Sequence, residues 1–317
     1  MMISMLRSVA FWLVVFCFAP LSADAPAYSV TDITWHDSLR DRDVPARIYA
    51  PTSGQGPFPV IIFSHGLGGS KTGYAYLGEY WASYGYIVVH VQHLGSDSAV
   101  LWPLQKMSEA MKNPENYINR PKDISFAIDQ LTAMNVASGS WHGRLDLSHI
   151  GVAGHSFGGY TTMAIAGATL RESSGEIENF RDPRVKAIVA MSVPPIKSQD
   201  FSAVQIPAFH VTGTDDQIRI VPGDSVADRR IPYDEAKGPD TYLVIFKGAN
   251  HMSFSGREGL LETDAQKAVD ATVHDLVLRS TVAFWDAYLK DDLKAKTWLA
   301  RGGFAQTLGV KGTFEEK

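Results

Sequence analysis

Short apolar runs rich in β-branched residues alternate along the chain with longer segments of helical periodicity. This alternation is typical of a mostly parallel sheet with helices on both faces, so the predicted fold class is α/β. The runs predicted as strands, the first two as a hairpin, are 28–35, 44–49, 59–64, 86–92, 149–154, 185–192, 208–212 and 242–246. The segments predicted as helices are 73–84, 120–134, 158–170 and 265–289.

Three longer stretches lack a regular pattern and are expected to form loops. They cover residues 94–117, 171–183 and 216–240. Loops beyond the strand ends are where substrate pockets form in sheets of this kind. Because Pro121 is tolerated only near the beginning of a helix, the helix after the first stretch is expected to start at Arg120.

Residues 1–27 have the pattern of a secretory signal peptide, with Arg7 before an apolar run over 9–18. Small residues follow at Ala23, Ala25 and Ala27. The apolar run is too short for a membrane span, which needs roughly 20 residues. We therefore expect cleavage, export to a periplasm or the outside medium, and a single domain over 28–317 without a stable membrane anchor.

Composition narrows the function classes further. The formal net charge is −5, and no basic block or stripe suggests a nucleic-acid partner. The only cysteine, Cys17, lies in the predicted signal peptide. A disulfide, a cysteine nucleophile or a cysteine metal site is therefore not expected in the mature domain.

The sequence Gly-His-Ser-Phe-Gly over 154–158 matches the G-x-S-x-G pattern between a predicted strand and a predicted helix. Such a serine must lie on a tight turn, where side chains two residues before and after it would collide. The bare pattern also occurs by chance, but the strand before it and the helix after it favour function. Ser156 is therefore predicted to be a nucleophile.

A second glycine-rich segment, His-Gly-Leu-Gly-Gly over 65–69, follows the apolar strand that ends at Ser64. Acyl transfer requires two N–H donors for the developing oxyanion. We expect one from Phe157, the residue after the nucleophile, and the other from Leu67. The alternative is an ordinary glycine-rich turn into a helix, but the position after this strand favours an oxyanion loop.

The general base is expected to be a histidine late in the chain, and His251 follows the last predicted strand. His274 lies in a predicted helix and His210 in a predicted strand. His90 and His93 suggest a metal pair, yet residues three apart on a strand face opposite sides, so a structural role is favoured.

The acid that orients this base is expected after the preceding strand, where Asp215 and Asp216 are adjacent. Their side chains point in different directions, so only one can meet the histidine. Asp216 is favoured and Asp215 is the alternative. A turn-capping role for both is the structural alternative.

The chain resembles α/β-hydrolases of the platelet-activating factor acetylhydrolase and predicted dienelactone hydrolase group. The segments that carry the resemblance are 63–97, 154–159, 213–216 and 248–256. It covers roughly 28–290 and implies the α/β-hydrolase fold, Asp216 as the triad acid and short acyl groups such as acetyl. Dienelactone hydrolases use a cysteine nucleophile where this chain has Ser156, so lactone chemistry is not implied.

Together these features predict a serine carboxylic-ester hydrolase that acts through an acyl-enzyme on a small-molecule, short-acyl ester. No metal and no organic cofactor is expected. Trp102, Met252 and Phe254 are expected to line the substrate pocket. The alternatives are cutinase-like or lipid-ester hydrolysis, and less favoured a peptidase or a non-catalytic binding protein on the same fold.

Overall fold

The computed structural model describes residues 28–171, 175–194, 196, 198–218, 224–257 and 263–317. The predicted signal peptide lies outside these residues. Nine described strands form one sheet in the order β1-β2-β4-β3-β5-β8-β10-β11-β12. These strands are β1 Tyr28–Asp37, β2 Arg42–Pro51, β3 Phe58–Ser64, β4 Ile87–Val91, β5 Leu145–His155, β8 Val185–Met191, β10 Ala208–Asp215, β11 Thr241–Asn250 and β12 Gly312–Glu316.

The interior of this sheet is parallel from β4 to β11, and antiparallel strands extend it at both edges. All five residues of β4 are buried, because a parallel strand with helices on both sides has no solvent-facing side. The apolar runs that predicted the strands follow from this burial. The predicted α/β fold class is confirmed.

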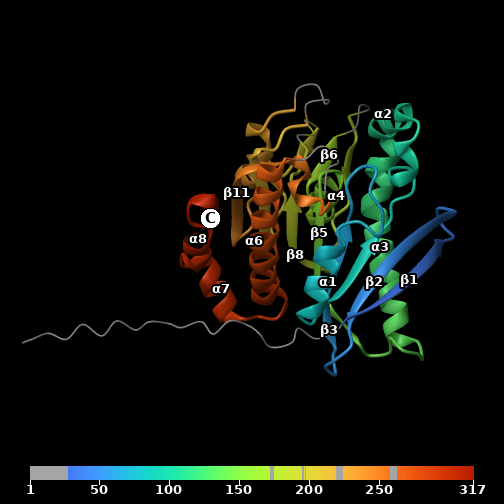
Figure 1. Ribbon diagram of the computed structural model, residues 1–317. Helices are drawn as coiled ribbons and strands as arrows, with labels where there is room; N and C mark the ends of the chain where they lie inside the picture. Colours follow the sequence, from blue (N-terminus) through green and yellow to red (C-terminus); the bar gives the residue numbers. More distant parts are fainter. Residues whose placement is uncertain (1–27, 172–174, 195, 197, 219–223, 258–262) are drawn as a thin grey trace, which may run out of the picture.

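The helices cover both faces of the sheet (Figure 1). Trp81 of α1 and Trp285 of α6 belong to an aromatic-rich core on one face. Ile128 of α3 and Met163 of α4 belong to the core on the other face. The helices are α1 Ala75–Ser83, α2 Leu104–Lys112, α3 Pro114–Val136, α4 Phe157–Ala166, α5 Ile231–Glu235, α6 Asp264–Leu289, α7 Leu293–Ala300 and α8 Gly303–Leu308. Short 3₁₀ turns are η1 Ser98–Leu101, η2 Ala227–Arg230, η3 His251–Phe254 and η4 Gly309–Lys311.

Helix α3 begins at Pro114, before the predicted start, so Pro121 lies inside it. Proline has no N–H, and the carbonyl of Tyr117, four residues earlier, therefore loses its usual helical donor. The hydroxyl of Tyr160 on α4 donates to that carbonyl at 3.0 Å instead. A tertiary contact thus allows the helix to continue through the proline.

Other boundaries also differ from the prediction. The expected loop over 94–117 contains η1 and α2, and α4 ends at Ala166 because Gly167 takes a φ of 120°. A small second sheet, in the order β7-β6-β9, follows α4. Its strands are β6 Thr169–Arg171, β7 Ile177–Asn179 and β9 Gln199–Asp200. Within the described part of the chain, every helix is too short or too polar to cross a bilayer.

Candidate active site

The three residues predicted as nucleophile, acid and base lie together at the carboxyl ends of the parallel strands. Ser156 follows β5, Asp216 follows β10 and His251 follows β11. Because these strands run in the same direction within one sheet, their carboxyl ends lie at one edge. Residues far apart in the sequence are therefore brought together there.

Ser156 lies on a sharp turn between β5 and α4. Its φ of 55° and ψ of −120° are rare for a residue with a side chain. A Cβ on Gly158 would overlap the carbonyl oxygen of Ser64, and one on Gly154 would overlap the carbonyl oxygen of Gly158. The two glycines of the motif are therefore required for the helix to approach the strands this closely.

The serine, histidine and aspartate form one hydrogen-bonded series. His251 Nε2 lies 2.9 Å from Ser156 Oγ, and His251 Nδ1 lies 2.8 Å from Asp216 Oδ1. With the Nδ1 proton donated to the carboxylate, Nε2 accepts from the serine hydroxyl. Asp216 is fully buried, whereas the side chain of His251 is 12% exposed. This geometry allows proton transfer from Ser156 to His251.

The carboxylate of Asp216 is held ionised by its surroundings. Burial alone would raise its pKa, but the hydrogen bond and charge of His251 and the charge of Arg229 outweigh burial and lower the pKa to about 2. Arg229 Nε lies 3.4 Å from Asp216 Oδ1, and Thr212 Oγ1 donates to Oδ2 at 2.7 Å. Asp215, in contrast, is exposed and accepts from Thr214. The structure thus brings Asp216, and not Asp215, to the histidine.

A neighbouring histidine fixes the backbone of His251. His155 Nε2 lies 2.9 Å from the carbonyl oxygen of His251, so this nitrogen carries the proton and donates it. The other nitrogen, Nδ1, then accepts from the hydroxyl of Tyr74 at 2.8 Å. Burial, and then the charge of His251, lower the pKa of His155 to about 3, so its ring is neutral near pH 7. The sequence motif did not predict this positioning role.

The loop over 65–69 lies directly beside the nucleophile. A Cβ on Gly66 would come within 3.3 Å of Ser156 Cβ. The Gly68 N–H donates to the Ser96 carbonyl at 2.9 Å. The amides of Leu67 and Phe157 donate to no acceptor among the described residues. Phe157 is also the first residue of α4, where an N–H has no partner within the helix. Both predicted amides are therefore open to an incoming oxygen.

The three expected pocket residues differ in their exposure. Trp102 is 81% and Met252 48% exposed. Phe254 is fully buried, and its ring packs in the core beside His155 and Phe246. The expectation that Phe254 lines the pocket is therefore corrected: the 3₁₀ turn after His251 directs this ring inward.

Apart from His155 and His251 itself, no histidine in the described part of the chain bonds to Ser156, Asp216 or His251. His90 and His210 are buried in strands, and His274 Nε2 lies 2.8 Å from the Ser253 carbonyl oxygen. His93 bonds to Ser64 and Asp123. No group of three or more histidine, cysteine or acidic residues suited to a metal occurs in the described part of the chain.

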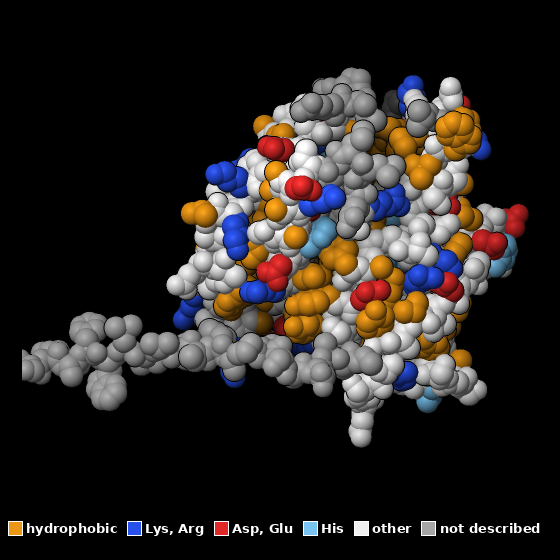
Figure 2. Space-filling model, viewed as in Figure 1, with side chains coloured by type: hydrophobic (Ala, Val, Ile, Leu, Met, Phe, Trp, Pro, Cys, Tyr) orange, Lys and Arg blue, Asp and Glu red, His pale blue; other side chains and the backbone are white. Residues whose placement is uncertain are grey.

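Charge is mixed on the described surface that Figure 2 shows. Blue and red side chains are interspersed across that face, and neither sign forms a continuous stripe. Nothing on this face resembles the basic footprint of a nucleic-acid-binding protein.

A strained serine turn after a central parallel strand, followed along the chain by an acid and then a histidine, each after a later strand, is typical of the α/β-hydrolase class. The family model described as "Platelet-activating factor acetylhydrolase, isoform II" matches residues 26–129. The chain thus has the α/β-hydrolase fold and is similar to platelet-activating factor acetylhydrolases, with the family model covering less than half of the chain.

Individual relatives support this relationship. A platelet-activating factor acetylhydrolase from Cavia porcellus is 24% identical over 294 residues, covering 80% of this chain and 63% of that protein. Cutinase 2 from Thermobifida cellulosilytica is 26% identical over 168 residues, covering 53% of this chain and 51% of that protein. The chain thus spans less than two thirds of the length of these relatives.

Proposed function

We propose that the protein is a serine carboxylic-ester hydrolase that acts through an acyl-enzyme. The observation that carries this proposal is the series Ser156–His251–Asp216, with distances of 2.9 and 2.8 Å. His251 Nε2 takes the hydroxyl proton as Ser156 Oγ bonds to the ester carbonyl carbon, and the carbonyl π electrons move to oxygen. The amides of Leu67 and Phe157 donate to that oxyanion.

The reaction then proceeds in two half-reactions, and the first ends when the tetrahedral intermediate collapses to an acyl-enzyme. The C–O bond to the alcohol breaks, and the alcohol leaves with the proton from His251. In the second half-reaction His251 takes a proton from water as the water oxygen bonds to the acyl carbon. The bond from this carbon to Ser156 Oγ then breaks, His251 returns the proton to Ser156 Oγ, and the acid leaves. Asp216 keeps the imidazole in the productive tautomer throughout. These steps use protein groups and water, so we propose no metal or organic cofactor.

The proposed substrate class is a small-molecule ester with a short acyl chain. The names of the relatives, acetylhydrolase and cutinase, both denote ester hydrolases. Cutinase-like hydrolysis of a polyester is the second candidate, favoured by the similarity to Cutinase 2. Trp102 and Met252, both well exposed, are proposed to form the substrate rim.

A series of p-nitrophenyl esters of increasing acyl length tests the substrate class. Each accommodated methylene contributes about 0.8 kcal/mol of burial, so a large pocket would give kcat/KM that rises with chain length. We expect a maximum at about two to four acyl carbons instead. Faster release of acid from a suspended polyester than from these short esters would favour the cutinase-like candidate.

The Ser156→Ala variant tests the reaction itself. Wild type should hydrolyse p-nitrophenyl acetate and become labelled by a fluorophosphonate probe, and Ser156→Ala should lose both properties with unchanged circular dichroism. An inactive, unlabelled wild type would favour the binding-protein alternative. Faster turnover of a matched amide than of the ester would favour a peptidase.

We further propose that residues 1–27 direct export and are then removed. The apolar run over 9–18 and the small residues after it support this proposal. N-terminal sequencing of protein from the native host should find a start between Asp24 and Tyr28. A soluble protein that retains Met1 would contradict it.

A further inference from the structure

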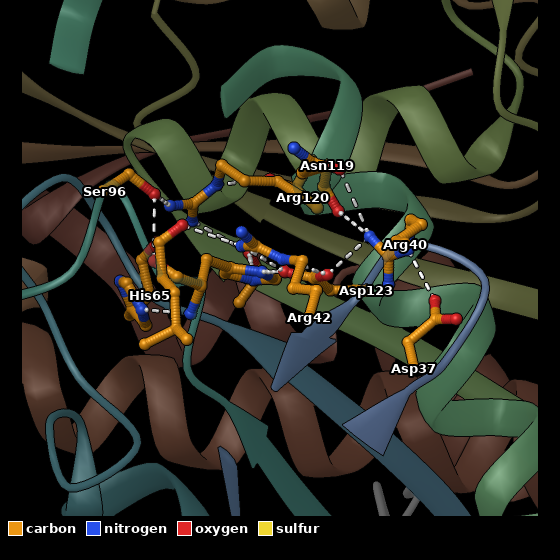
Figure 3. Close-up of polar contacts among 12 residues, drawn as sticks. Asp37, Arg40, Arg42, His65, Ser96, Asn119, Arg120 and Asp123 are labelled. Carbon is orange, nitrogen blue, oxygen red and sulfur yellow. Dashed lines mark hydrogen bonds and ion pairs between the residues drawn. The ribbon is translucent and has the colours of Figure 1, made fainter. Parts of the chain in front are cut away.

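A buried arginine lies beneath the loop that supplies one oxyanion amide. Arg120 of α3 is 1% exposed (Figure 3). Its Nε donates to Thr161 Oγ1 at 3.0 Å and its Nη1 to Ser96 Oγ at 2.8 Å. Its Nη2 donates to Ser64 Oγ at 3.1 Å and to the carbonyl oxygen of His65. Burial lowers the pKa of Arg120 to about 9, so the group keeps its charge near pH 7.

Arg120 contacts both segments that carry the two proposed oxyanion donors. The His65 carbonyl is two residues before the Leu67 amide, and Ser96 also accepts the N–H of Gly68 through its own carbonyl. The guanidinium carbon lies 4.4 Å from the ring centroid of Phe157, the residue with the second amide. One planar group therefore spans the two sides of the oxyanion hole.

A second series of hydrogen bonds orients Ser64, one of the four acceptors of Arg120. Because Ser64 Oγ accepts from Arg120, its proton is donated to His93 Nε2 at 2.9 Å. His93 Nδ1 then donates to Asp123 Oδ2 at 3.0 Å, and Arg40 and Arg42 donate to the same carboxylate (Figure 3). Burial lowers the pKa of His93 to about 4, which keeps this ring neutral.

This series contains the residue types of a catalytic triad but cannot act as one. Ser64 is 0% exposed, as are His93 and Asp123, so no substrate reaches its hydroxyl. Its serine proton is directed to His93, and its oxygen accepts from Arg120. The arrangement can orient the guanidinium but cannot attack an ester.

We propose that Arg120 is a positioning residue that fixes the Leu67 and Phe157 amides in the geometry that binds the oxyanion, an inference that rests on the proposed ester hydrolysis. Arginine is suited to this task because its donors form a rigid planar fork, and Arg120 uses it to reach four acceptors. Lysine has a point charge with three donors on a flexible chain, so it cannot hold the same four acceptors in one plane.

Arg120→Lys tests this role, with Arg184→Lys as the matched control. Arg184 also bonds to α3, through Asp129 and the carbonyl of Ser125, but has no contact with the loop over 65–69. Loss of one oxyanion donor lowers kcat by about 10²–10³, so misaligned donors should lower it by roughly 10- to 100-fold. We expect this loss in Arg120→Lys, a KM changed less than about threefold, and near wild-type kinetics in Arg184→Lys.

Rates are normalised to the fraction of sites that a fluorophosphonate titrates, which removes the effect of misfolded protein. Affinity for a trifluoromethyl ketone, which forms a tetrahedral oxyanion on the serine, should fall by the same factor as kcat. Affinity for a non-reactive ketone-free analogue should stay unchanged, because that ligand forms no oxyanion. A merely structural role would not separate these two affinities.

Thr161→Val provides a test if Arg120→Lys does not fold. It removes the acceptor of Arg120 Nε, together with the hydroxyl that donates to the Phe157 carbonyl at 3.0 Å. It should lower kcat and ketone affinity together, by about three- to tenfold at unchanged KM. Kinetics and ketone affinity equal to those of Arg184→Lys would overturn the positioning role while wild type remains an active esterase. Wild type without esterase activity would instead overturn the proposed function.

Discussion

The backbone of Ser156 is held in a conformation that costs of order 1–3 kcal/mol for a residue with a side chain. Its φ of 55° is maintained because β5 and α4 are both fixed by the surrounding core. This strained turn points the Ser156 hydroxyl away from the sheet, and its Oγ lies 2.9 Å from His251 Nε2. The neighbouring groups are arranged around this one fixed atom.

Asp216→Asn should reduce kcat/KM by roughly 10⁴-fold, because an amide at this position favours the wrong imidazole tautomer. Asp215→Asn should change it less than about threefold, since its exposed carboxylate accepts from Thr214 and not from His251. Both variants are assayed with p-nitrophenyl acetate after a check of folding. The reverse order of effects would make Asp215 the acid.

The sequence predicts the residues of the proton-transfer series, because each follows a strand within a short motif. Arg120, Arg229 and His155 were missed for a physical reason. Arg120 meets Ser64 and Thr161, which are 56 and 41 positions away, and nothing in the local sequence separates it from the other basic residues. Only the folded chain shows which of them are buried beside the site.

Helix α3 shows that a side chain from another helix can allow a helix to continue through a proline. Pro121 predicts a helix start, yet the helix continues because Tyr160 supplies the donor that the proline lacks. The parallel strands of the main sheet, in contrast, were each predicted, since burial on both faces demands continuous apolar runs. Their bounds differ by up to four residues, as at β5 and β11, and the edge strand β12 and the small second sheet were not predicted. Local patterns therefore give the parallel strands, and tertiary contacts modify the helices.

Tyr160→Phe should destabilise the protein by about 1–3 kcal/mol, because the Tyr117 carbonyl loses its donor inside the protein. In a Pro121→Ala background the cost should be smaller, since the alanine that replaces the proline has an N–H that can bond to that carbonyl. Urea unfolding of the four proteins in this cycle measures the coupling. Equal costs in both backgrounds would mean that the hydroxyl does not compensate for the proline.

On the scale of the whole molecule, buried neutral histidines make stability sensitive to acid. Burial lowers the pKa of His90, His155 and His210 to about 3 and that of His93 to about 4, and lowers that of His65 well below its usual value. An unfolded chain binds protons at these rings near pH 6.5, whereas the folded chain does not. Their stabilising contribution is therefore complete above about pH 6.5. It is lost as the pH falls toward about 4 for His93 and toward about 3 for His90, His155 and His210.

His210→Phe should reduce the pH dependence of the free energy of unfolding, because it removes one buried titrating ring. Among the described residues this ring has no bond to Ser156, Asp216 or His251. Each such histidine contributes a slope of about 1.4 kcal/mol per pH unit between pH 4 and 6. The free energy of unfolding, measured by urea at several pH values, should lose that slope in the variant. Parallel curves for the two proteins would show that His210 is protonated in the folded state as well.

The contrast between Trp102 and Phe254 bears on how this protein could change. Both were expected at the pocket, but Trp102 is 81% exposed and Phe254 is part of the core. Substitutions at exposed positions usually alter stability by no more than about 0.5 kcal/mol. Under the proposed ester hydrolysis, substitutions at the proposed rim residues Trp102 and Met252 should therefore change substrate preference with little loss of stability, while Ser156, Asp216 and His251 stay fixed at the strand ends.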